Sequence, residues 1–70
     1  MACEAAKRHV AEVLRRRGAT TAEEAWKRVG WWTRETISEA LDELAEAGAV
    51  ERTEEVMRYA RFYDLAGRRA

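Results

Sequence analysis

Seventy residues allow one small domain, in which folding buries only about 60% of the surface that the unfolded chain exposes. A hydrophobic content of 47% is enough for a compact core despite 37% charged residues, which argues against a disordered chain. Thirteen basic residues balance thirteen acidic ones, so the net charge of zero gives no overall attraction to nucleic acid, and any attraction must come from a local patch.

The cysteine content and the hydropathy pattern indicate the cellular compartment of the protein. The single cysteine, Cys3, cannot form an internal disulfide, and with one histidine in the chain there is no cluster for structural zinc. No apolar run approaches the roughly 20 residues of a membrane span, and the first ten residues lack the apolar core of a signal peptide. We therefore expect a cytoplasmic protein with no membrane partner, present as a monomer or a small oligomer.

The chain contains no Asn, Gln or Pro, and its arginines outnumber its lysines eleven to two. This bias is compatible with a hot-living source, because Asn and Gln are thermolabile, or with a biased genomic base composition. It also removes the two side chains that usually read adenine, so any base reading would fall to Arg, Ser, Thr or carboxylates.

Two helices are predicted in the first thirty residues. Apolar side chains recur at steps of three and four over residues 3–17, and Gly18 is suited to end that helix. Thr21, followed three residues later by Glu24, resembles a capping box, which predicts a second helix over residues 21–29.

A third helix is expected over residues 33–47, with Thr33 as its N-cap and Gly48 as its C-terminal stop. Its apolar side is formed by Ile37, Leu41 and Leu44. The opposite side is strongly acidic: one base stands against five acids, a net charge of −4 that repels phosphate. The charged residues are Arg34, Glu35, Glu39, Asp42, Glu43 and Glu46.

Acidic residues three or four apart on this face repel one another, by roughly 0.2 to 0.5 kcal/mol per pair in an isolated helix. The cluster should therefore gain from a cationic neighbour. Three sources are open: the chain's own arginines, a second subunit, or a basic partner protein. A solvated face without any such role is the simplest alternative.

After Gly48 the pattern changes from helical to extended. The segments 49–53 and 59–65 alternate or are rich in β-forming residues, which predicts a β-hairpin over residues 49–65. The connection over residues 54–58 holds no Gly or Asn, so we expect a long, loose loop there and not a tight turn.

The order helix, short strand, helix, turn, helix, hairpin resembles the winged helix-turn-helix domain of bacterial and archaeal transcription regulators, over nearly the whole chain. The segments TAEEAWKRVG and TRETISEALDELAEAGAVER resemble the second helix and the third helix with the first wing strand, and YARFYDL resembles the return strand. The resemblance implies an α+β, mainly α, fold in a single domain over residues 1–70. The turn departs from the family, because the stretch from Gly30 to Ile37 is one residue longer and holds two tryptophans.

In this family the third helix enters the DNA major groove by its N-terminal half, and the wing contacts the backbone or the minor groove. The resemblance therefore implies double-stranded DNA as partner and a role in transcription regulation, with no cofactor and no small-molecule substrate. However, relatives often carry basic residues at the positions of Glu39, Ala40 and Asp42, and this chain has none there. The residues expected to contact DNA are Lys27, Arg28, Thr33, Arg34, Thr36, Ser38, Arg52, Arg58 and Arg61.

Arg15, Arg16 and Arg17 form the densest basic stretch of the chain. They either compensate the dipole at the end of the first helix or contact phosphate.

A second hypothesis is a winged-helix module that binds another protein or a second copy of itself. Trp31 and Trp32 are adjacent and cannot easily both be buried, and a large aromatic side chain at the surface indicates a protein contact, whereas Trp26 is expected in the core. The residues assigned to this alternative are Trp31, Trp32, Glu35, Glu39, Asp42 and Met57.

Nothing in the sequence predicts an enzyme. No nucleophile stands beside a base, and there is neither a glycine-rich phosphate loop nor a metal-ligand spacing.

Overall fold

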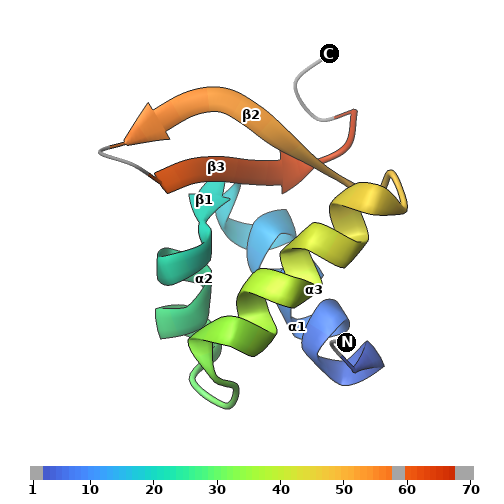
Figure 1. Ribbon diagram of the computed structural model, residues 1–70, viewed down its shortest axis with the longest axis vertical. Coiled ribbons are helices and arrows are strands. Elements are labelled where there is room, and N and C mark those ends of the chain that lie inside the picture. Colours follow the sequence, from blue (N-terminus) through green and yellow to red (C-terminus); the bar gives the residue numbers. More distant parts are fainter. Residues whose placement is uncertain (1–2, 58–59, 68–70) are drawn as a thin grey trace.

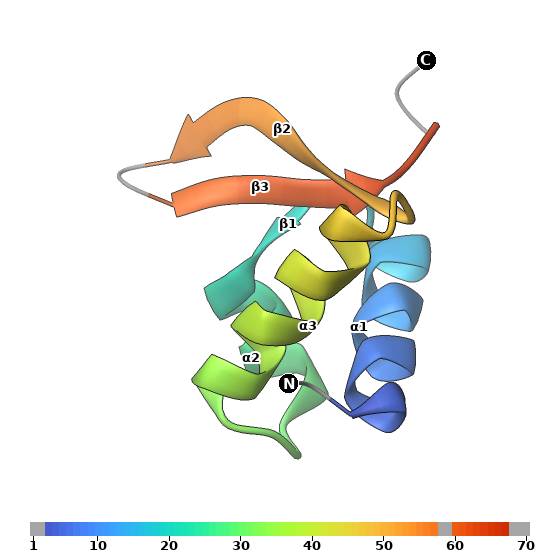
Figure 2. The same ribbon diagram turned by 45° about the vertical axis from the view of Figure 1, so that its right-hand side comes forward.

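The computed structural model describes the backbone of residues 3–57 and 60–67, and the side chains of those residues except 54–57 and 60. Three helices pack beneath a small antiparallel sheet, whose hairpin extends beyond α2 (Figure 1; Figure 2). Its strand order is β1-β3-β2. This is the winged helix-turn-helix arrangement, so the predicted fold class is confirmed. The elements are α1 (Glu4–Arg17), β1 (Thr20–Thr21), α2 (Ala22–Val29), α3 (Arg34–Glu46), β2 (Val50–Met57) and β3 (Ala60–Leu65).

The predicted N-caps are present. The Thr21 hydroxyl accepts a hydrogen bond from the backbone N–H of Glu24, and the Thr33 hydroxyl accepts one from the N–H of Thr36. Both threonines have extended backbone angles, so α2 and α3 each begin one residue after the start that the sequence predicted. At the other end of α3, Ala47 is the cap and Gly48 follows with φ +82°, a conformation that side chains disfavour.

The link after α1 is a strand of two residues. Thr20 pairs with Tyr63 and Thr21 pairs with Phe62 of β3. This pairing ties the start of α2 to the sheet, because Thr21 is both the last residue of β1 and the N-cap of α2.

The wing differs from the sequence prediction. A loose loop was expected over residues 54–58, but β2 continues through Met57, which pairs with Ala60, so the prediction is wrong for residues 54–57. Residue 58 lies outside the described residues. The extra length is absorbed inside the strand: Arg52 and Val56 are four residues apart, whereas their partners Tyr63 and Arg61 are two apart. A bulge lets a strand hold extra residues and stay paired, so residues without a regular alternating pattern can still belong to β2.

The core lies between the three helices and the start of β2. Its largest fully buried side chains are Val10 and Leu14 from α1 and Ile37 and Leu41 from α3. Burying each contributes roughly 1.5 to 3 kcal/mol. Partly buried side chains that pack against this core include Trp26, Trp32, Leu44 and Tyr63.

One buried polar group in the sheet lacks a partner. Thr53 is buried, and its hydroxyl oxygen finds no hydrogen-bond partner among the described residues. Leaving a buried hydroxyl unpaired costs about 1 to 3 kcal/mol.

We expect Thr53→Val to raise the free energy of unfolding by about 1 kcal/mol, measured by urea denaturation, because valine keeps the shape and suits a strand. A fall in stability would show that the hydroxyl has a partner.

Candidate nucleic-acid interface

The first turn of α3 is ordered by its own side chains. Besides capping the N–H of Thr36, the Thr33 hydroxyl lies 2.9 Å from the Thr36 hydroxyl. Ser38, one turn further on, is half-buried. The short hydroxyl side chains expected to contact DNA therefore lie at the start of α3, and two of them are already bonded to each other.

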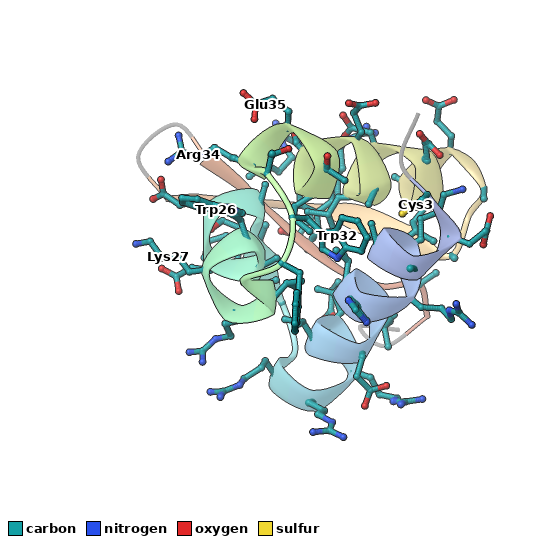
Figure 3. The ribbon with its side chains drawn as sticks, turned by 90° about the horizontal axis from the view of Figure 1, so that it is seen from below. Cys3, Trp26, Lys27, Trp32, Arg34 and Glu35 are labelled. Carbon is teal, nitrogen blue, oxygen red and sulfur yellow. The ribbon has the colours of Figure 1, made fainter. Side chains whose placement is uncertain are left out.

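The Arg34 side chain packs against α2. Its guanidinium lies 4.8 Å from the centre of the Trp26 ring and pairs with Glu23 at 3.3 Å. The side chain is still 58% exposed, so donors remain available on its outer edge. Figure 3 shows Arg34 and Lys27 on the α2 side of the molecule with Trp26 between their positions, whereas Glu35 points away from α2.

The two basic residues at the end of α2 are separated by the structure. Lys27 is exposed on the side of Arg34 (Figure 3), but Arg28 lines a hollow together with Arg16 and Arg17 from the end of α1. Residues adjacent in a helix point about 100° apart, which accounts for the split. Arg28 is thus grouped with α1 and not with the start of α3.

Asp42 is bound by two residues of the wing. Its Oδ1 accepts a hydrogen bond from the Arg52 guanidinium at 2.8 Å and another from the Tyr63 hydroxyl at 3.1 Å. The Arg52 guanidinium also lies 5.9 Å from the centre of the Tyr63 ring. The bond to Asp42 raises the pKa of Arg52, and burial raises the pKa of the Tyr63 phenol. Asp42 therefore fixes α3 to β2 and β3.

Glu43 is paired on the opposite flank of α3. Lys7 of α1 lies 3.0 Å from its carboxylate, with both side chains about three-quarters buried, and a second contact to Glu4 measures 3.5 Å. The bond to Glu43 raises the pKa of Lys7. The chain's own cations thus pair with Asp42 and Glu43, two of the acids of α3. One of these cations is a lysine, which the expectation of arginine neighbours had missed.

In the wing, Arg61 is exposed and its guanidinium donates to the backbone carbonyl of Thr53 at 3.4 Å. Two predicted site residues cannot be placed: Arg58 and the side chain of Met57 lie outside the described residues.

The three tryptophans have different environments. Trp26 packs half-buried against the core. Trp32 is also half-buried, lies between α1 and α3 (Figure 3), and donates its indole N–H to His9 Nδ1 at 3.2 Å. Trp31 is 83% exposed, which confirms that the adjacent pair is not buried together.

Several of these contacts could not be predicted from the sequence. Asp42 and Tyr63 are 21 residues apart, and neither the Lys7–Glu43 pair nor the Trp32–His9 bond follows a local spacing rule. Within residues 3–57 and 60–67, no group of three or more His, Cys, Asp or Glu side chains could hold a metal ion. In the same part of the chain, every helix is too short or too polar to cross a membrane.

No protein-family model matches the chain, and no curated protein matches it. A solved structure is similar: the crystal structure of the Zalpha domain from Carassius auratus PKZ in complex with Z-DNA, with a TM-score of 0.75 and 23% sequence identity. The match covers 87% of this chain and 92% of that one. At this level of identity the likeness shows the fold alone, and it supports the winged-helix assignment.

The raised pKa of Tyr63 gives a test of the contact between α3 and the wing. As the pH rises past about 10, the unfolded phenol ionises before the half-buried phenol of the folded chain does, so stability that is fully present below pH 10 is lost as the pH rises through the folded pKa. We expect Tyr63→Phe to reduce the fall in Tm between pH 9 and pH 11, measured by circular dichroism. The raised pKa of Lys7 acts in the same direction above about pH 10.5, so part of the fall should remain.

The absorbance of the phenolate provides the control for this experiment. Tyr59 and Tyr63 are the two tyrosines of the chain, so the variant leaves one titrating phenol. If the wild-type chain showed no phenol that ionises later than the one left in the variant, the burial of Tyr63 would be contradicted.

Proposed function

We propose that this chain is a small DNA-binding domain of a transcription regulator, which contacts duplex DNA with the start of α3, the adjoining end of α2 and the wing. The shared fold supports this proposal, since the similar Zalpha domain was crystallised in complex with Z-DNA. In winged-helix proteins generally, the third helix and the wing are the parts that meet DNA.

The observation that carries the proposal is the pairing of Asp42 with Arg52. Considered alone, α3 has a net charge of −4 and would repel phosphate. In the folded chain, Arg52 of the wing forms an ion pair with Asp42, and Lys7 of α1 forms one with Glu43. Glu35, which is exposed at the start of α3, remains a source of repulsion there, and the cations Arg34 and Lys27 lie nearby.

The same charge balance limits the strength of binding. In the part of the chain that the structure describes, Lys27, Arg34 and Arg61 are exposed cations of the proposed surface that are not paired with an acid of α3, and they offer about three phosphate contacts. For duplex DNA this corresponds to a slope of roughly −3 in a plot of log binding constant against log salt concentration. We therefore propose binding that is directed mainly at the backbone and is readily released by salt.

A salt series with duplex DNA tests this proposal. Binding of a fluorescently labelled 20-base-pair duplex should be detectable at low salt, and Lys27→Ala and Arg34→Gln should each make the slope shallower by about 0.9, because each removes one phosphate contact. Arg8→Ala is the matched control, because Arg8 is an equally exposed cation but lies on α1. No binding at low salt, or an equal effect of the control, would contradict the proposal.

A variant that adds positive charge provides a second test of DNA binding. Glu35 is exposed and points away from α2 (Figure 3). Glu35→Lys should tighten binding and steepen the salt slope, since it replaces repulsion by a phosphate contact. Unchanged binding would show that the start of α3 does not approach DNA.

A further inference from the structure

The surface between α1 and α2 carries two hollows that adjoin each other. One, of about 270 Å³, is lined by cations, and the other, of about 200 Å³, is lined by aromatic and aliphatic side chains. Glu12 and Val13 line both, so the two hollows form a single depression, which we call the α1–α2 groove. Its cationic end is formed by Arg16, Arg17 and Arg28, and its aromatic end by His9, Val29 and Trp31.

The cationic end holds more positive charge than the chain neutralises. Glu12 accepts hydrogen bonds from Arg16 at 2.7 Å and from Arg15. Arg17 and Arg28 are exposed and form no ion pair within the described part of the chain. Three guanidinium groups around one carboxylate leave room for further anionic groups.

The aromatic end presents a large apolar side chain at the surface. Trp31 is 83% exposed, whereas its neighbour Trp32 is half-buried and bonded to His9. The Trp32–His9 bond ties the turn to α1, so Trp31 is presented beside Val29 and Val13. Tryptophan is among the residues that contribute most when an interface buries them.

We propose that the α1–α2 groove binds an acidic segment of a partner protein that also carries an apolar side chain. The apolar side chain packs against Trp31, Val13 and Val29, and the carboxylates pair with Arg17 and Arg28. From His9 to Arg16 the groove follows α1 for seven residues, or roughly 10 Å. The apolar and acidic groups of the segment are therefore about two helical turns, or three extended residues, apart.

Two other occupants fit the groove less well. A DNA backbone would need a row of cations along the surface, but here an apolar floor and Glu12 separate the cations from Trp31. A second copy of this chain would offer its acidic α3, but Asp42 and Glu43 of that helix already pair with Arg52 and Lys7. Lys27 and Arg34 do not line the groove, so the proposed site differs from the proposed DNA-contacting surface.

Direct titration tests the site. The probe is a labelled 12-residue peptide of Glu and Asp around a central Leu-Phe pair, followed by fluorescence polarisation and by ¹H–¹⁵N spectra of the protein. We expect shifts at the Trp31 indole and at the backbone of Val13 and Arg28. Trp31→Ala and Arg28→Glu should each weaken binding at least about tenfold.

Matched controls separate this site from general electrostatics. Arg8→Glu makes the same charge reversal on α1 at a residue outside the groove, and it should change binding less than twofold. A peptide with Lys in place of its acids, and one with Ala in place of Leu-Phe, should bind at least about tenfold more weakly. Circular dichroism of each variant verifies that it is folded.

Several outcomes would overturn the proposal: no shifts at millimolar peptide, equal loss in Arg8→Glu and Arg28→Glu, or unchanged binding by Trp31→Ala. Loss of duplex binding in Arg28→Glu, with displacement of the peptide by duplex, would also overturn it, because the groove would then be a nucleic-acid site. A failure of the peptide alone leaves the salt series on Lys27 and Arg34 unaffected, so the two proposals fail separately.

Discussion

The position of α3 is the constraint on which the rest of the structure depends. This helix contacts α1, α2 and β2, and it supplies Ile37 and Leu41 to the core. Its outer face is acidic. Lys7 forms an ion pair with this face on one side, and Arg52 and Tyr63 donate hydrogen bonds to it on the other. The apolar side fixes the depth at which α3 packs, and the two polar attachments connect it to the first helix and to the wing.

These attachments have a cost for nucleic-acid binding. An arginine that bonds Asp42 has fewer donors left for phosphate, so Arg52 reduces the repulsion of α3 while also reducing the attraction of the wing. The densest unpaired positive charge in the described chain lies elsewhere, in the hollow that Arg17 and Arg28 line. The molecule therefore has a third helix whose negative charge is partly offset by Lys7 and Arg52, and a basic surface between α1 and α2.

Local chemistry could be predicted from the sequence. Thr21 and Thr33 cap the starts of α2 and α3, and Gly48 follows the end of α3, as expected, because capping depends on the residue itself and on backbone atoms a few positions away. The burial of Ile37 and Leu41 followed from helical periodicity. The candidate site was predicted less well. The separation of Arg28 from Lys27 and the bond between Asp42 and Tyr63 depend on how the helices and the wing are packed, and no local spacing encodes that packing.

The bulge in β2 affects how readily another chain could pair with the edge of the sheet. With the order β1-β3-β2, one side of β2 has no strand beside it, and such an edge is a template onto which another chain can add. The irregular register between Arg52 and Val56 interrupts the regular row of backbone donors and acceptors there. The strand sequence VERTEEVM also places four charged residues along this edge. Irregular backbone and charge together disfavour edge-to-edge pairing with another chain, although the wing extends away from the helices.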